Sequence, residues 1–354
     1  MIKFGNFDSI QISRPYFIAD IAANHDGDLQ RAFKLIELAK LSGADAAKFQ
    51  NFSAEKIVSS GGFDDLGVKL SHQSKWTKSV FQVYKEASID AEWTQKLKNK
   101  CDEVGIEYMS TPYDIESLEL INPYVNAIKI GSGDITWHQF LREVAKKNKP
   151  VILSTGASSM NDVNLAVDEI LKFNNQLVLM QCNTNYTGSE NNFNYINLNV
   201  LKEYQKKYPE FILGLSDHTP GHSTVLGAIA LGAKVIEKHF TDDTRRNGPD
   251  HAFSMDPISW REMVDRSIEL FNSIGNGNKI VEENEKESIL VQRRGTYLTV
   301  DKLKGDYIAL EDVKYLRPIS LDGIPPYIME ELVGKKLLVN KKKQQQLLRN
   351  ELEK

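Results

Sequence analysis

The sequence predicts a closed (β/α)₈ TIM barrel followed by a small, mainly β-sheet domain. Three observations support this α/β fold class: eight short apolar runs occur within the first 241 residues, stretches with helical periodicity lie between most of them, and the composition changes near residue 289. Eight strands that alternate with helices are the number found in such a barrel. A doubly wound open sheet is the structural alternative, but it usually has fewer strands.

The eight apolar runs give the expected strands, which are residues 16–24, 46–52, 106–113, 126–133, 150–156, 177–183, 211–218 and 234–241. The stretch between the first two runs is a clear amphipathic helix. Its apolar face consists of Leu29, Phe33, Ile36 and Ala39. Asp28 is expected to cap this helix at its N-terminus, and Gly43 is expected to end it.

A long link and a change in composition define the predicted organisation. Residues 53–105 separate the second and third strands; links of this length often carry lids or binding loops, and part of this one is expected to be helical. We predict the barrel over residues 1–280, a charged linker over 281–288 and the small module over 289–354. The last stretch, KKKQQQLLRNELEK (341–354), is expected to be a solvated, frayed tail.

The composition is that of an ordinary globular protein and excludes several functional classes. Apolar residues make up 41% and charged residues 26%, the net charge is −4, and no basic stripe stands out. Nucleic acid and membrane surfaces are therefore not expected as partners. Cys101 and Cys182 are too few for a disulfide framework or a thiolate zinc site. Because no signal peptide or membrane-length apolar run is recognisable, a cytoplasmic location is expected.

Polar residues gather at the C-terminal ends of the predicted strands. They are Asp20, Asn24, Lys48, Gln50, Thr111, Lys129, Ser132, Ser154, Asn183, Ser216, His218, Glu237 and His239. In a (β/α)₈ barrel this end carries the active site. A single polar residue there would be explained by packing, but the same pattern on all eight strands indicates a functional pocket.

Two histidines in this set indicate a metal site. His218 and His239 lie at the ends of adjacent strands, where neutral imidazoles can bind a divalent cation. Side chains two residues apart on a strand share a face, so Glu237 and His239 point the same way. A carboxylate, either Glu237 or Asp250, is expected to complete the ligand set.

Two lysines in the set indicate an anionic ligand. Lys48 and Lys129 would meet its charge, and the hydroxyls of Thr111, Ser132 and Ser154 suit phosphate or carboxylate oxygens. The GSGD turn at 131–134 is expected to let the backbone approach the ligand closely, because glycine tolerates unusual dihedral angles. The structural alternative is that the lysines form buried ion pairs with acidic residues of the same pocket.

The chain resembles the sialic acid synthase family, the nonulosonate synthases. The resemblance is carried by ADIAANHDGD (19–28), KFQNF, STPYD, KIGSGD, LSTGAS, LSDHT, EKHFT and GPDHAFSM in this order. The segments LKGDYIALEDVKYLRP and GIPPYIMEELVGKKL resemble the antifreeze-like (SAF) domain of that family. The resemblance implies condensation of phosphoenolpyruvate with an N-acylated hexosamine, dependent on Mn²⁺ or Mg²⁺.

The resemblance also implies roles for individual residues. His218 and His239, with Glu237 close by, would bind the metal. Phosphoenolpyruvate would be held by Lys48, Thr111, Lys129, Ser132, Ser154 and Ser216. The sugar would be handled by Gln50, Tyr186 and Asp250. Arg317 would reach the site of the partner subunit in a homodimer with exchanged C-terminal domains.

Proton transfers are assigned to a carboxylate near the metal, Asp20 or Asp134. Both positions depart from the family, which usually has glutamate there, and the family tends to have a bulky residue where this chain has Gly295. We therefore expect an acceptor other than N-acetylmannosamine, such as a 2,4-diacetamido-2,4,6-trideoxyhexose that leads to a legionaminic-type acid. The alternatives are another metal-dependent barrel, such as an aldolase, or a catalytically inactive barrel that serves as a binding protein.

Overall fold

The computed structural model describes residues 1–66, 73–74 and 76–353. Part of the predicted link, residues 67–72 and 75, lies outside the described residues. The chain divides into two compact units, a barrel unit, Met1–Gly275, and a C-terminal unit, Asn276–Lys354. None of the helices in the described part of the chain has the length and apolar character that a membrane crossing requires.

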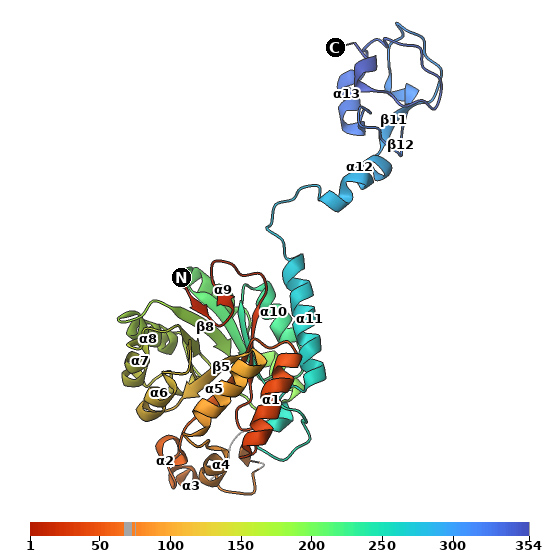
Figure 1. The fold of residues 1–354 in the computed structure, drawn as a ribbon. Helices are drawn as coiled ribbons and strands as arrows, with labels where there is room; N and C mark the ends of the chain where they lie inside the picture. Colours follow the sequence, from red (N-terminus) through yellow and green to blue (C-terminus); the bar gives the residue numbers. More distant parts are fainter. Residues whose placement is uncertain (67–72, 75, 354) are drawn as a thin grey trace. The chain divides into compact units, whose positions relative to one another are not determined.

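The predicted barrel fold is confirmed (Figure 1). Its strands are β3 (Tyr16–Asp20), β4 (Ala46–Asn51), β5 (Glu107–Pro112), β6 (Ile128–Ile130), β7 (Val151–Ser154), β8 (Leu177–Cys182), β9 (Ile212–Asp217) and β10 (Val235–His239). They are parallel and hydrogen-bonded in the order β5-β4-β3-β10-β9-β8-β7-β6. The two end strands, β5 and β6, pack beside each other, so the sheet nearly closes into a barrel.

Helices lie between the strands, and most of them cover the outside of the barrel. They are α1 (Leu29–Leu41), α2 (Ala54–Ile57), α3 (Gly62–Asp65), α4 (Val80–Ala87), α5 (Trp93–Val104), α6 (Ile115–Ile121), α7 (His138–Ala145), α8 (Met160–Leu171), α9 (Val200–Lys207), α10 (Ser223–Ala230) and α11 (Pro257–Ser273). The predicted cap of α1 is confirmed, because Asp28 accepts from the backbone of Gln30 and Arg31. Gly43 follows the helix at φ +91°, a conformation that suits glycine. The link carries α2 to α5, so its predicted helical content is also present.

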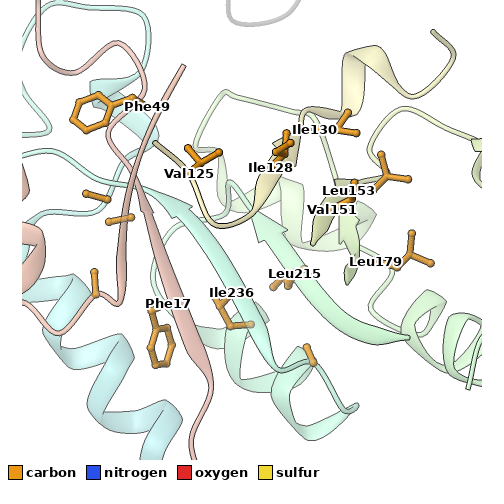
Figure 2. Close-up of a cluster of buried hydrophobic side chains, with 14 of the residues drawn as sticks. Phe17, Phe49, Val125, Ile128, Ile130, Val151, Leu153, Leu179, Leu215 and Ile236 are labelled. Atoms are coloured by element: carbon orange, nitrogen blue, oxygen red, sulfur yellow. The ribbon is translucent and has the colours of Figure 1, made fainter. Parts of the chain in front are cut away.

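The main hydrophobic core lies between the outer face of the strands and the helices. Figure 2 shows part of it, including Phe17, Phe49, Leu153, Leu215 and Ile236, all of which are buried. These residues come from five different strands, and each points away from the barrel axis because side chains alternate along a strand. This shell fixes the strands, and with them the side chains that point inward.

The barrel interior changes from apolar to polar along the strands. Its apolar layer includes Ile2, Phe4 and Phe7, which come from the hairpin of β1 (Lys3–Phe4) and β2 (Phe7–Asp8) and the residue before it. The residue two positions beyond each apolar inward residue points inward too. The pairs are Ile18 and Asp20, Ala46 and Lys48, Met109 and Thr111, Ala127 and Lys129, Ile152 and Ser154, and Val235 and Glu237. The polar layer therefore lies at the C-terminal ends of the strands.

The C-terminal unit has its own small core. Its antiparallel pair is β11 (Gly295–Leu298) and β12 (Val313–Leu316), and its helices are α12 (Lys286–Gln292) and α13 (Met329–Leu332). The stretch expected as a linker, 281–288, contains a short 3₁₀ turn and the start of α12. The expectation of a frayed tail is wrong, because Leu347 and Leu352 are buried in the core of this unit. The surrounding lysines and glutamines make this short apolar pattern hard to recognise in the sequence.

Candidate active site

A pocket at the C-terminal ends of the strands collects residues from all eight of them. The cavity measures about 150 Å³. Its strand residues are Asp20, Lys48, Gln50, Thr111, Lys129, Ser154, Cys182, Ser216, Glu237 and His239, and the loops that follow the strands add Ser132, Tyr186, His218 and Asp250. The structure therefore brings together 13 of the 15 residues predicted from the sequence, all except Asp134 and Arg317.

Lys48 lies at the centre of a carboxylate network on one side of the pocket. Its Nζ donates to Asp20 Oδ2 at 2.7 Å and to Thr111 Oγ1 at 3.3 Å. The strand register places Lys48, Asp20 and His239 at one level, and His239 Nε2 lies 3.6 Å from Asp20 Oδ2. Burial lowers the pKa of Lys48, but the negative charges of Asp20 and Glu237 outweigh burial and raise it. Lys48 is therefore a protonated, buried cation.

Lys129 faces the pocket from β6, two strands away from Lys48 in the barrel. Its Nζ donates to Ser154 Oγ at 2.7 Å and lies 3.5 Å from Glu237 Oε1. Burial lowers the pKa of Lys129, and the nearby Lys48 contributes in the same direction, although Glu237 opposes both. Two buried lysines thus share Glu237 as a counter-ion. The buried lysine–carboxylate ion pairs considered as an alternative from the sequence are present in the structure. Both lysines nevertheless line the cavity, so their ammonium groups can also donate to a ligand.

His218 and His239 form the pair of imidazoles expected for a metal site. Their ring centroids are 5.4 Å apart. His218 Nδ1 lies 2.9 Å from the carbonyl oxygen of Asn183, which can only accept, so Nδ1 carries the proton and Nε2 keeps a lone pair. His239 Nδ1 is buried without a hydrogen-bond partner, and burial holds the pKa of His239 well below its usual value. Burial lowers the pKa of His218 too, but its contacts with Cys182 and the Asn183 carbonyl outweigh burial and raise it. His239 is therefore neutral as it stands, and His218 would have to give up any added proton to bind a divalent cation beside it.

Glu237 does not join these histidines. Its Oε1 accepts from Ser216 Oγ at 3.3 Å and faces the two lysines. Among the described residues, no three His, Cys, Asp or Glu side chains are grouped so that they could hold a metal ion. The geometry offers a cation the two imidazoles and leaves its other positions to water or substrate. Glu237 acts in this structure as the counter-ion of Lys48 and Lys129.

Asp134 and Arg317 are the two predicted residues that do not line the pocket. Asp134 belongs to the 3₁₀ turn Ser132–Asp134, and burial raises the pKa of its carboxyl to about 6. It acts electrostatically on the pocket tyrosines Tyr84 and Tyr113 instead of facing the cavity. Arg317 lies in the C-terminal unit, where its Nε donates to the Gln292 carbonyl at 2.5 Å. Its role at a barrel site stays a prediction.

The expected close approach of the backbone does not occur at the GSGD turn (131–134). Gly131 and Gly133 have no positive φ, and a Cβ on Gly131 would meet its nearest atom, the Tyr113 hydroxyl, at 3.4 Å. The demanding position is Gly156 in LSTG, where a Cβ would lie 2.5 Å from Thr184 Cγ2 and 2.9 Å from Ser132 Oγ. The backbone N–H of Gly156 donates to that Ser132 oxygen. Close approach therefore occurs one strand later than the sequence suggested.

The sequence reasoning missed one polar and several apolar residues of the pocket. Cys182 points inward from β8, and its thiol is hydrogen-bonded to His218 and Ser132. Burial raises the pKa of this thiol, but those contacts outweigh burial and lower it. The strand alternation around Ser154 and Ser216 could have identified this residue. The missed residues of the link are Phe52, Ile57, Trp76, Val83, Tyr84 and Ala87, for which no comparable signal existed.

An eight-stranded barrel with two buried lysines, hydroxyls and paired histidines at its mouth defines an enzyme that binds an anionic substrate. Residues 35–279 match the model of the NeuB family, and the chain belongs to this family of phosphoenolpyruvate-dependent nonulosonate synthases. It is therefore an enzyme that condenses phosphoenolpyruvate with an amino sugar.

Relatives and solved structures support this assignment along most of the chain. An N,N'-diacetyllegionaminic acid synthase of Legionella pneumophila is 35% identical over 92% of this chain and 91% of its own length. A pseudaminic acid synthase of Campylobacter jejuni is 32% identical over 95% of both. The crystal structure of an N-acetylneuraminic acid synthetase from Leptospira borgpetersenii has 28% identity and a TM-score of 0.70, covering 82% of this chain and 96% of that one.

Proposed function

We propose that this enzyme joins phosphoenolpyruvate to an N-acylated hexosamine and releases phosphate, and that the product is a nonulosonic acid of the sialic or legionaminic type. The acceptor is N-acetylmannosamine or a 2,4-diacetamido-2,4,6-trideoxyhexose. The proposal is carried by one observation: two buried lysines and a pair of imidazoles converge on the same pocket. The names of the Legionella and Campylobacter relatives support a nonulosonic acid product.

Phosphoenolpyruvate binds on the side of the pocket formed by β4 to β9. Lys129 and Lys48 face its phosphate and carboxylate charges, and hydroxyls complete the binding. The hydroxyl donors are Thr111, Ser132, Ser154 and Ser216. Charge-assisted hydrogen bonds of this kind position the enol carbon and stabilise the charge that develops as phosphate leaves.

His218 and His239 would hold a divalent cation, Mn²⁺ or Mg²⁺, in this pocket. When bound, such a cation polarises the aldehyde as a Lewis acid. The neutral state of His239, which follows from its burial, keeps its nitrogen available for the cation. The adjacent Tyr186 ring, whose centroid is 4.4 Å from that of His218, helps to fix the orientation of the imidazole.

Asp20 manages the proton transfers. The methylene carbon of phosphoenolpyruvate forms a bond to the aldehyde carbon, and the aldehyde oxygen gains a proton. Water adds to the carbon that bears the phosphate and loses a proton. The bond from that carbon to the phosphate oxygen then breaks, which releases phosphate and leaves a ketone. Asp20 Oδ2 is close to Lys48 and His239 and can relay protons at this position. Asp134 is assigned an indirect role, because it does not line the pocket.

Gln50, Tyr186 and Asp250 bind the sugar at the outer part of the pocket. Burial raises the pKa of Asp250 to about 6, and its Oδ2 accepts from the backbone N–H of Ala23 at 3.1 Å. Arg317 of a second subunit completes this side in a domain-swapped homodimer. Exchange of the C-terminal unit is part of the proposal, and it follows from the family resemblance.

Phosphate release from phosphoenolpyruvate tests the proposal. The full-length protein is assayed with Mn²⁺ against N-acetylmannosamine, its 6-phosphate and a 2,4-diacetamido-2,4,6-trideoxyhexose. We expect release with one or more acceptors, loss of release with a chelator and recovery when Mn²⁺ or Mg²⁺ is restored. Release that ignores the chelator would contradict the metal assignment, and release without any acceptor would contradict the condensation.

A further inference from the structure

The carboxylate of Asp26 holds both ends of the loop segment that carries Asp250. Arg246 donates to Asp26 Oδ2 from Nε at 2.9 Å and from a terminal guanidinium nitrogen at 2.7 Å. His251 Nε2 lies 2.9 Å from Asp26 Oδ1 and carries the shared proton, because an ionised carboxylate only accepts. We call residues 246–251 the arc. Its first and last residues are therefore tied to one side chain, and the proposed chemistry gives that side chain no role.

The arc is part of an exposed loop that nevertheless contributes to the active-site cavity. Residues 241–250, which the structure describes throughout, form neither a helix nor a strand, and 245–248 are exposed. Asp250 lines the cavity, and its Oδ2 accepts from the backbone N–H of Ala23 at 3.1 Å. Ser254 Oγ donates to the Asp250 carbonyl at 2.7 Å. A loop of this kind depends on such side-chain contacts for its position.

The groups that tie down the arc are themselves fixed by the fold. The His251 side chain is fully buried, and its Nδ1 lies 2.7 Å from Thr241 Oγ1. Gly248 folds over this ring, since a Cβ on Gly248 would lie 2.6 Å from His251 Cδ2. Asp26 has φ +53°, a left-handed conformation that aspartate adopts more readily than most residues. Asp26 also belongs to the same loop after β3 as Ala23, so one loop holds both the arc and the Asp250 carboxylate.

Asp26 acts within the fold and does not line the active-site cavity. Its Oδ1 is engaged by His251, and its Oδ2 by Arg246 and by Arg31, whose Nε is 3.2 Å away. Burial raises the pKa of Asp26, but the hydrogen bonds from His251 and Arg246 outweigh burial and lower it. The carboxylate is therefore ionised near neutral pH. A contribution of Asp26 to turnover has to pass through the arc.

We infer that Asp26 is a positioning residue for the amino sugar, because it fixes the arc between Arg246 and His251 and so sets the Asp250 carboxylate against the acceptor. This inference rests on the proposed function, in which Asp250 binds the sugar, and extends it to a residue outside the cavity. Displacement of a binding group by about 1 Å can cost up to about 10²-fold in rate. Loosening the arc should therefore weaken use of the sugar and leave phosphoenolpyruvate binding unaffected.

Asp26→Asn tests the inference in the full-length enzyme. Asparagine keeps the side-chain shape and suits the same backbone conformation, but only one of its two terminal atoms can accept a hydrogen bond. Phosphate release is measured with phosphoenolpyruvate, Mn²⁺ and either N-acetylmannosamine or a 2,4-diacetamido-2,4,6-trideoxyhexose. We expect KM for the sugar to rise roughly tenfold, the lower end of the loss for one hydrogen bond to a charged group, with KM for phosphoenolpyruvate unchanged.

Asp243→Asn is the matched control. Asp243 lies in the same loop and accepts from Arg245, so it does not tie the arc to the loop after β3, and it does not line the cavity. We expect it to leave both KM values unchanged. An equal rise in KM for the sugar in Asp243→Asn would show that any loss of charge from this loop has the same effect, and it would overturn the inference.

Arg246→Ala releases the arc at its exposed end, where the fold is not at risk. We expect KM for the sugar to rise several-fold, in the same direction as in Asp26→Asn. Arg245→Ala, on the neighbouring exposed arginine that pairs with Asp243, should have no such effect. Equal effects of the two arginine variants would contradict a specific role of the contact with Asp26.

A double-mutant cycle separates the positioning of Asp250 from a general loosening of the site. In an Asp250→Ala background, Asp26→Asn should raise KM for the sugar little further, because the group that Asp26 positions is already gone. An equal rise with and without Asp250 would overturn the inference, since Asp26 would then act through a different group.

Limited proteolysis tests the arc without any turnover. Trypsin binds the arginine side chain before the cleaved bond, so cleavage after Arg246 requires that its guanidinium leave Asp26. We expect Asp26→Asn to speed cleavage of the 246–247 bond several-fold, with the cut located by mass spectrometry. Unchanged cleavage would overturn the inference and leave the proposed function intact. No turnover of any acceptor by the unmodified enzyme would overturn the proposed function itself, and the role of Asp26 in sugar binding with it.

Discussion

Strand β10 buries charged groups on both of its faces, and the two faces differ in how those groups are satisfied. On the outer face, Lys238 donates to Asp217 Oδ2 at 2.5 Å and to the Thr219 carbonyl at 2.6 Å. Asp217 also accepts from the hydroxyls of Thr219 and Thr224. On the inner face, Glu237 Oε2 and His239 Nδ1 are buried without partners.

The comparison separates a structural charge from a functional one. Both faces carry the same cost of removing charge from water. The outer pair recovers this cost through several short hydrogen bonds within the fold. On the inner face Glu237 meets Lys48 and Lys129 through Oε1, but its Oε2 and His239 Nδ1 have no partner within the fold, as expected for groups at a ligand site. The following predictions test this difference, from the largest expected effect to the smallest.

His239→Ala should abolish metal-dependent turnover, with a fall in kcat on the order of 10³-fold, because one of the two imidazoles is lost. The protein should remain folded, since His239 makes no hydrogen bond within the fold through Nδ1. Phosphate release and tryptophan fluorescence measure the two effects. His138→Ala, a half-buried histidine outside the pocket, is the control. Unchanged turnover in His239→Ala would remove the metal assignment.

Lys238→Met should lower the free energy of unfolding by about 3–5 kcal/mol, because it leaves Asp217 buried without its cation. KM for phosphoenolpyruvate should be unchanged in the folded enzyme. Urea unfolding followed by tryptophan fluorescence reports on the barrel unit alone, because Trp76, Trp93, Trp137 and Trp260 all lie in it. The double variant with Asp217→Leu should recover part of the loss. A large rise in KM would mean that the outer face also serves the site.

Lys129→Met should raise KM for phosphoenolpyruvate roughly 10–100-fold, since a charge-assisted contact to the substrate is worth about 1.5–3 kcal/mol. KM for the sugar should change much less. Steady-state kinetics with each substrate varied in turn separates the two constants. Lys147→Met, on a lysine outside the pocket that pairs with Glu119, is the control. Equal effects on both substrates would argue against a specific role in phosphoenolpyruvate binding.

In mild acid His25, a buried group satisfied only in its neutral form, should make an unfavourable contribution to the stability of the barrel unit. Its sign is opposite to that of Asp134 and Asp250, whose raised pKa values favour the folded state as pH falls. Burial lowers the pKa of His25 to about 4, and its Nδ1 accepts from the Gly27 N–H. The unfolded chain binds this proton near pH 6.5, so its contribution is complete above pH 6.5 and declines as pH falls toward 4. The loss of this contribution by pH 4 is about 3 kcal/mol at about 1.36 kcal/mol per pKa unit, measured by urea unfolding at several pH values. His25→Asn should flatten this part of the profile, and an unchanged profile would contradict the assignment.

Arg317→Ala should raise KM for the sugar about tenfold, the loss expected for one hydrogen bond to a charged group. KM for phosphoenolpyruvate should stay close to that of the unmodified enzyme. Arg349→Ala, an exposed arginine of the same unit, is the matched control. If phosphoenolpyruvate affinity fell instead, the role proposed for this arginine would be wrong. Removal of residues 289–354 should cost most of the activity, whereas a barrel that works alone would keep it.

Most of the polar residues at the strand ends could be predicted, because the alternation of side chains along a strand depends only on neighbouring residues. Ser216 and His218, or Glu237 and His239, are two residues apart, so their shared direction follows from the strand alone. The apolar residues of the link that line the pocket could not be predicted, because Phe52 and Tyr84 are far apart in the sequence and their rings meet only in the folded barrel. The burial of Leu347 and Leu352 was missed for a related reason, since their partners lie elsewhere in the C-terminal unit.

The sequence by itself determined the barrel, the inward polar layer and the pair of histidines, because each depends on periodicity and on the order of short motifs. The tertiary structure decided which carboxylates pair with lysines and which face the pocket. Glu237 shares a strand face with His239, yet its carboxylate forms ion pairs with the lysines of β4 and β6. Asp134 follows Ser132 by two residues, yet it does not line the cavity. These outcomes depend on distances between strands that only closure of the barrel fixes.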